Sequence, residues 1–231
     1  HLLDEIRKAF TEGNQEKAEM LTRQNFNSEV SYDADGETPF RFGSFTTMGE
    51  FYVETGLNII GMSDYKRILS LDSAMAVVQF KKDHVVYQRN YFISYPANVM
   101  VMRFSADQPG KQNLVFSYAP NPVSTGNMAS DGNKGLVYSA SLDNNGMKYV
   151  VRIQAETKGG TLFNADGKLT VKGADEVVFY ITADTDYKPN FDPDFKDPKT
   201  YVGVNPEETT KEWMNNAVSQ RYTALFSQHY N

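Results

Sequence analysis

The chain has 231 residues, no cysteine and a formal net charge of −6, from 23 basic and 29 acidic residues. The lack of cysteine excludes disulfides, thiolate catalysis and zinc-finger ligation. The acidic balance argues against a nucleic-acid partner, and no stretch approaches the roughly 18 apolar residues that a membrane-spanning helix needs.

The chain opens inside a helical pattern, without an initiating Met, a basic n-region or an apolar h-region. We therefore expect a piece of a longer protein, with no signal peptide in these residues. Apolar residues at helical spacing predict a helix near residues 2–12, which Gly13 ends. Asn14 can cap a second helix near 15–25, with Ala18 and Leu21 facing inward.

Residues 28–47 are irregular, with a polar stretch at 33–37 and several aromatics at 39–45. We expect a loop that its aromatic base fixes to the core.

Five runs of β-branched, aromatic and Met residues follow, separated by short turn-forming stretches. Within them, alternate residues fall on opposite faces, as Ala76, Val78 and Phe80 do. Short strands at this spacing predict an antiparallel meander in a mostly β fold of two sheets packed face to face. The runs are 65–72, 74–80, 84–94, 98–104 and 113–117.

The second half continues the β pattern and then changes character. Residues 123–134, rich in Ser, Asn, Gly and Asp, predict a flexible connection. A hairpin is predicted around 143–146, followed by three more short strands, the last at 176–183. Four prolines between 187 and 206 predict a stiff, extended linker with aromatic anchors.

A final helix is predicted to begin at Pro206, with Asn205 as its cap. Its expected apolar stripe consists of Trp213, Ala217, Val218, Tyr222 and Leu225.

A glycosidase needs two carboxyl groups across a sugar pocket, one of them able to hold a proton. Only Asp72, Glu156 and Glu176 lie in or beside predicted strands. Acids in such positions are most often solvated, so we assign no catalytic residue and leave the substrate-binding residues unassigned.

The sequence predicts neither a metal site nor a cofactor. His1, His84 and His229 share no ligand spacing with one another or with a carboxylate. The acidic stretches at 33–37 and 192–197 resemble partial calcium loops but lack the Gly and the distal Glu, so turns are the better interpretation.

Motifs spread over nearly the whole chain resemble one family of carbohydrate enzymes. Their shared order resembles the N-terminal β-domain of glycoside hydrolase family 95, the α-L-fucosidase-type enzymes, which is related to the N-terminal domain of family 65-type enzymes. The sequence departs at Thr46-Thr-Met-Gly-Glu50, where related chains often carry Tyr-x-Pro-Leu-Gly-Asp. The motifs are Leu3-x-Glu5-Ile-Arg-Lys8, Glu12-Gly13, Ala18-Glu19, Tyr65-x-Arg67-x-Leu69-x-Leu71-Asp72-x-Ala74, Tyr87-x-Arg89-x-x-Phe92-x-Ser94-x-Pro96, Val99-x-Val101-x-Arg103, Gly173-Ala174-Asp175-x-Val177, Thr185-x-Tyr187 and Tyr222-x-x-Leu225-x-x-x-His229.

The resemblance implies a large antiparallel supersandwich, as in mutarotase-like enzymes, with a short N-terminal helical insertion and a C-terminal linker helix. It implies a sandwich domain over 1–187, with its first strands absent. Residues 188–231 would be a Pro-rich linker and helix leading to an (α/α)6 barrel beyond residue 231. In that family the catalytic groups belong to the barrel.

The parent enzyme would thus hydrolyse terminal α-L-fucosides or α-L-galactosides, with inversion and without a metal, in the periplasm or outside the cell. The partners of this domain would be its own barrel and the glycan. The alternative is a stand-alone carbohydrate-binding module, which predicts an exposed row of Tyr or Trp on a concave face. A purely structural or assembly domain is a third option.

Overall fold

The computed structural model describes residues 2–26, 46–143, 145–190 and 198–230. Most of the aromatic loop expected at 28–47, and both calcium-like stretches, lie outside these residues. The chain divides into two compact units, His1–Thr46 and Thr47–Asn231.

The first unit is a pair of helices, α1 (Leu2–Thr11) and α2 (Gln15–Phe26). They pack through Ile6, Ala9 and Ala18, which are buried. The Asn14 side chain accepts a hydrogen bond from the backbone N–H of Lys17 at 3.1 Å, as an N-cap does. These helices lie where the apolar spacing predicts them.

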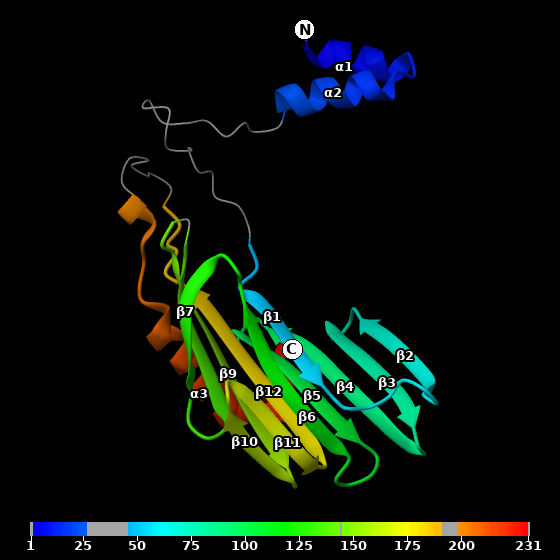
Figure 1. Cartoon of the computed structure of the whole chain (residues 1–231), viewed down its shortest axis with the longest axis vertical. Helices are drawn as coiled ribbons and strands as arrows, with labels where there is room; N and C mark the ends of the chain where they lie inside the picture. Colours follow the sequence, from blue (N-terminus) through cyan, green and yellow to red (C-terminus); the bar gives the residue numbers. More distant parts are fainter. Residues whose placement is uncertain (1, 27–45, 144, 191–197, 231) are drawn as a thin grey trace. The chain divides into compact units, whose positions relative to one another are not determined.

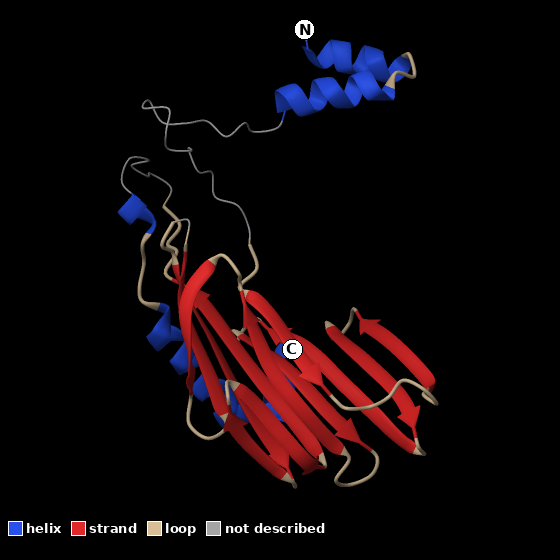
Figure 2. Ribbon diagram, viewed as in Figure 1, coloured by secondary structure: helices blue, strands red, loops and turns tan. Residues whose placement is uncertain are grey.

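The second unit contains two antiparallel sheets (Figures 1 and 2). One has eight strands in the order β2-β3-β4-β5-β12-β9-β8-β7, and the other has four in the order β1-β6-β11-β10. The predicted fold, mostly β with two sheets, is confirmed. The strands are β1 Gly49–Glu54, β2 Ser63–Ser70, β3 Met75–Lys82, β4 Val85–Ser94, β5 Val99–Ala106, β6 Gln112–Pro120, β7 Ser124–Ser130, β8 Gly135–Leu142, β9 Lys148–Lys158, β10 Thr161–Ala165, β11 Lys168–Ala174 and β12 Glu176–Thr185.

The predicted five-strand meander is correct for β2 to β5 and wrong for the fifth strand. β6 crosses to the four-stranded sheet, and β12 takes the place beside β5. Residues Val177–Ile181 of β12 are all buried, as in a central strand covered on both faces, whereas β6 buries alternate residues and suits a sheet covered on one face.

The flexible connection predicted at 123–134 is also wrong, because it contains strand β7. β7 lies at the edge of the eight-stranded sheet and is mostly exposed, so it lacks the apolar alternation by which strands are recognised. A side chain at Gly126 would come within 2.4 Å of the Ala140 side chain on β8, so this strand needs glycine for close approach.

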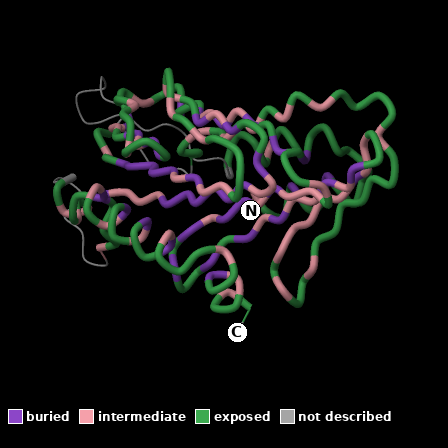
Figure 3. The backbone as a smooth tube through the Cα atoms, turned by 90° about the horizontal axis from the view of Figure 1, so that it is seen from below, coloured by how far each residue is buried: buried purple, intermediate pink, exposed green. Residues whose placement is uncertain are grey.

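The main core lies between the two sheets, where buried residues are concentrated (Figure 3). Phe116 of β6 and Phe179 of β12 are fully buried and stack with ring centroids 4.7 Å apart. Phe104 meets Phe179 edge to face at 5.9 Å. These rings join strands that are distant in sequence.

The outer face of the eight-stranded sheet is covered by α3 (Pro206–Tyr230). Met214, Ala217 and Leu225 are fully buried against a cluster that includes Val101 and Tyr180. Trp213, expected on this stripe, is only half-buried and lies outside the cluster, and Met214 takes the inward position one residue later.

The N-terminus of α3 is fixed to the sheet by Arg152 of β9, whose side chain is 5% exposed. Its guanidinium pairs with Asp131 at 2.7 Å and with Glu207 of α3 at 2.6 Å. The Ser139 hydroxyl donates a second hydrogen bond to Glu207, at 2.9 Å. Asn205 accepts from the Glu207 N–H at 3.1 Å, so the predicted helix cap is present.

Part of the predicted Pro-rich linker is described. Tyr187 stacks on Tyr201, with centroids 6.1 Å apart, and a β-bridge joins Tyr187 to Val202. Tyr201 ends a short 3-10 helix, Pro198–Tyr201. These contacts tie the two ends of the segment together.

Replacing Phe179 by alanine should lower the free energy of unfolding by about 3–5 kcal/mol, because it leaves a cavity between the sheets. Urea unfolding followed by circular dichroism measures the change. Phe163→Ala is the control: Phe163 is 41% exposed, and its loss should cost less than about 1 kcal/mol. Equal losses for both variants would contradict the assigned core.

The Arg152 anchor predicts different effects for two adjacent acids. Glu207→Gln should destabilise the protein by about 1–2 kcal/mol more than Glu208→Gln, because it removes one of the two carboxylates paired with a nearly buried guanidinium. Both acids lie in the first turn of α3, so their effects on the helix dipole are similar. Equal midpoints of unfolding would refute the anchor.

Candidate functional site

A cavity of about 790 Å³ lies on the outer face of the eight-stranded sheet, beside α3. We call it the outer-face pocket. It is lined by residues of β5, β9, β12 and α3 and by Lys134, which precedes β8. The lining residues are Arg103, Lys134, Glu156, Thr157, Lys158, Glu176, Val178, Tyr180, Arg221, Tyr222 and Thr223.

Strand register and a break in α3 produce this pocket. In the ladders, Val178 pairs with Arg103 on one side and with Glu156 on the other, while Glu176 pairs with Lys158. On the outer face, the charged side chains Arg103 and Glu156 therefore flank Val178, two residues before Tyr180 along β12, where the apolar part of the face begins. At Arg221 the backbone leaves helical geometry, with φ 59° and ψ 171°, so α3 is two helical segments that meet beside the charged area.

Arg103 is the central cation of the pocket. Its guanidinium donates to the Glu176 carboxylate at 2.5 Å and lies 4.9 Å from the centre of the Tyr222 ring. Burial alone would lower the pKa of Arg103, but the hydrogen bond and charge of Glu176, together with Tyr222, raise it above its ordinary value. Arg103 is therefore a permanent charge shared between an acid and an aromatic ring.

Tyr180 occupies the boundary between the apolar and charged areas. Its hydroxyl donates to Glu156 at 3.0 Å. Burial, followed by the charge of Glu156 and this hydrogen bond, raises the pKa of Tyr180. Burial also raises the pKa of Tyr222, although Arg103 partly opposes the shift. Both phenols are thus held neutral.

The structure brings together two of the three acids singled out in the sequence. Glu156 and Glu176 line one cavity, whereas Asp72 lies exposed in the turn after β2. The alternation of side chains along a strand indicates which face each acid occupies. The sequence does not show that β9 and β12 pair, so it could not predict that Glu156 and Glu176 lie on one shared face. Each of the two carboxylates already accepts a hydrogen bond from a neighbouring side chain.

The histidines do not form a site with one another. His84 is exposed in the tight turn between β3 and β4, where Asp83 and His84 both have positive φ. His229, at the end of α3, bonds through Nε2 to the Ser73 carbonyl oxygen at 3.0 Å and stacks on Phe92. His1 lies outside the described residues. Within those residues, no three His, Asp or Glu side chains are placed to hold a metal ion.

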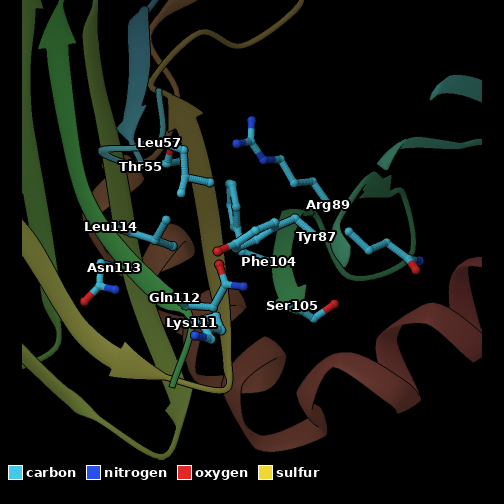
Figure 4. Close-up of a pocket in the computed structure, with 11 residues that line it drawn as sticks. Thr55, Leu57, Tyr87, Arg89, Phe104, Ser105, Lys111, Gln112, Asn113 and Leu114 are labelled. Atoms are coloured by element: carbon cyan, nitrogen blue, oxygen red, sulfur yellow. The ribbon is translucent and has the colours of Figure 1, made fainter. Parts of the chain in front are cut away.

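A second, much smaller cavity of about 10 Å³ lies between the sheets (Figure 4). It is lined by Tyr87 and Phe104 on one side and by Gln112 of β6 on the other. The Gln112 side-chain nitrogen is buried and has no hydrogen-bond partner among the described residues. A space of this volume is about that of one water molecule and is too small for a sugar.

Exposed tyrosines do not form the row that a carbohydrate-binding face would need. Tyr52 lies on β1 of the four-stranded sheet and Tyr65 on β2 of the eight-stranded sheet, 49% and 61% exposed. Tyr95 lies in the turn after β4. Tyr187 and Tyr230, also exposed, lie after β12 and at the end of α3, so the exposed tyrosines that the structure describes are spread over separate elements.

The two packed antiparallel sheets define a β-sandwich domain. Residues 1–190 match the family model described as "Glycosyl hydrolase family 65, N-terminal domain", and the chain belongs to this family. Assignment to family 95, implied by the motifs, is a narrower statement than this match supports.

Similar proteins include two curated fucosidases. The chain is 28% identical over 204 residues to "Probable alpha-fucosidase A" of Aspergillus niger, which covers 84% of this chain and 25% of that protein. It is 23% identical over 199 residues to "Alpha-L-fucosidase 2" of Arabidopsis thaliana, and this match covers 72% of this chain and 22% of that protein. The chain thus spans about a quarter of the length of these relatives.

A solved structure supports the fold. "Putative kojibiose phosphorylase from human microbiome" superposes with a TM-score of 0.51 at 10% identity, over 78% of this chain and 26% of that one. The helices that the structure describes include none with the length and apolar character of a membrane span.

The raised pKa of Tyr180 predicts a loss of stability in alkali. Below the ordinary tyrosine pKa of about 10, both folded and unfolded states hold this proton, so Tyr180 contributes no change of stability with pH. Above it, the unfolded state releases the proton first, and the free energy of unfolding falls as pH rises. Tyr180→Phe should make this fall shallower in urea titrations between about pH 9 and pH 11.

Tyr95→Phe serves as the control, since Tyr95 is 89% exposed. Its pH profile should match that of the unmodified chain. An unchanged slope in Tyr180→Phe would show that the phenol is not held neutral by the fold.

Proposed function

We propose that this chain is the non-catalytic N-terminal domain of an α-L-fucosidase-like glycoside hydrolase of family 95 type. The parent enzyme would remove terminal α-L-fucose or the closely similar α-L-galactose from glycans, in the periplasm or outside the cell. The order of the family motifs and the two fucosidase relatives support this assignment.

One observation in particular supports a non-catalytic role. The two acids that share the outer-face pocket are already engaged, Glu176 by Arg103 and Glu156 by Tyr180. A glycosidase pair needs one carboxyl group to carry a proton towards the leaving oxygen and another to act on the opposite side of the sugar. With both carboxylates engaged by neighbouring side chains, the bond-breaking acids would come from the barrel of the parent enzyme.

The end of the sandwich formed by β2 and β3 offers a surface for the rest of the parent chain. Several large apolar side chains are exposed there, among them Tyr65 at 61% and Leu69 at 67%. The four-stranded sheet ends at β1, so further strands added beside β1 would extend it across this exposed area. We assign this place to the first strands of the domain. Contact with the barrel is proposed for the linker and the C-terminal end of α3.

The rival function, a stand-alone carbohydrate-binding module, has less support. Phe80, Phe92, Phe104 and Phe116 are buried, and the exposed tyrosines that the structure describes lie on separate elements.

The proposal predicts a division of labour that an aryl α-L-fucoside can test. Purified residues 1–231 should release no product above the buffer rate, whereas the full-length parent enzyme should hydrolyse the substrate. The aryl α-L-galactoside should react with the parent as well, and an aryl β-D-glucoside is the negative control. Chromogenic rate measurements at equal molar concentration are sufficient.

Turnover by residues 1–231 would refute the non-catalytic role. A parent enzyme that is inert on both α-L-glycosides but active on another sugar would refute the fucosidase assignment and leave the domain role intact.

A further inference from the structure

The break in α3 places an arginine in a backbone conformation that favours glycine. Arg221 has φ 59° and ψ 171°, a region that non-glycine residues occupy only when the surrounding structure holds them there. A glycine would allow the same break without that strain. The side chain of Arg221 should therefore contribute something that offsets it.

Within the described part of the chain, Arg221 forms no ion pair or hydrogen bond that would provide this offset. Its side chain is exposed and lines the outer-face pocket. Two further cations that line the pocket, Lys134 and Lys158, also have no acidic partner within 4.0 Å among those residues. Glu176, which pairs with Lys158 in the strand ladder, is engaged by Arg103 instead.

The charges of the pocket contrast with those of the chain. Its lining contains four cations, Arg103, Lys134, Lys158 and Arg221, and two carboxylates, Glu156 and Glu176. An excess of positive charge therefore collects in one hollow of a protein whose net charge is −6. Such a hollow concentrates anions from solution.

The aromatic side chains of the pocket are not available for stacking on a sugar ring. Tyr180 is fully buried. Tyr222 has Arg103 4.9 Å from its ring centre and Phe226 in parallel contact at 6.2 Å. Recognition here would rest on charge and on hydrogen bonds, with Thr157 and Thr223 as further polar groups on the lining.

We propose that the outer-face pocket binds the anionic group, carboxylate or sulfate, of an acidic saccharide, with Arg221, Lys134 and Lys158 as its cationic ligands. The volume of about 790 Å³ is within the range of small-ligand sites. That the anion belongs to a saccharide rests on the proposed function. The pocket would thus hold an acidic part of a glycan away from the bond that the parent enzyme cleaves.

The test is calorimetric titration of residues 1–231 with an oligogalacturonate and with a matched neutral galactose oligosaccharide. The acidic oligosaccharide should bind, more weakly as salt increases, and the neutral one should not. Arg221→Gly should weaken binding about tenfold, the loss expected for hydrogen bonds to a charged group, while its unfolding midpoint stays the same or rises. Arg221→Lys should retain most of the affinity.

Two further variants separate the pocket from general surface charge. The double variant Lys134→Gln/Lys158→Gln should also weaken binding, whereas Lys211→Ala, which removes an exposed cation of α3 outside the pocket, should not. Wild-type affinity in Arg221→Gly would overturn the proposal, and so would binding of inorganic sulfate or poly-glutamate with no binding of the acidic oligosaccharide.

The parent enzyme distinguishes this proposal from the proposed function. Fucoside hydrolysis by the parent, with no acidic saccharide bound by residues 1–231, would refute the pocket alone. Specific binding together with an inert parent would refute the fucosidase assignment alone.

Discussion

The second unit depends on one strand that is buried on both faces. In β12, Val177, Phe179 and Ile181 point into the core between the sheets, while Val178 and Tyr180 pack in the cluster beneath α3. A strand of this kind must be covered by two layers, because either face left in water would expose large apolar side chains. The four-stranded sheet and α3 are those two layers.

The position of the candidate site follows from this constraint. α3 is held at its N-terminus by Arg152 and covers the apolar part of the outer face. Beyond Val178 the face becomes charged, at Arg103, Glu156 and Glu176, and offers a helix little apolar surface to bury. The break at Arg221 turns the second segment of α3 towards Phe92 on β4 and leaves the charged area open as the pocket.

The sequence predicts what depends on local spacing. The two N-terminal helices, the hairpin around 143–146 and the cap at Asn205 all follow from residues close together in the chain. The edge strand β7 could not be predicted because it lacks the apolar alternation of a buried strand. The crossing of β6 to the four-stranded sheet could not be predicted because pairing between strands distant in sequence decides it. The outer-face pocket was missed for the same reason: β5, β9, β12 and α3 are separated in sequence, and the break at Arg221 has neither Gly nor Pro to signal it.

Native-state hydrogen exchange tests the central role of β12 most directly. We expect the amides of Val177 to Thr182 to exchange only through global unfolding, with the highest protection among the described residues, while those of the edge strand β2 exchange through local opening. Protection in β2 equal to that in β12, or fast exchange in β12, would show that the second unit does not depend on β12.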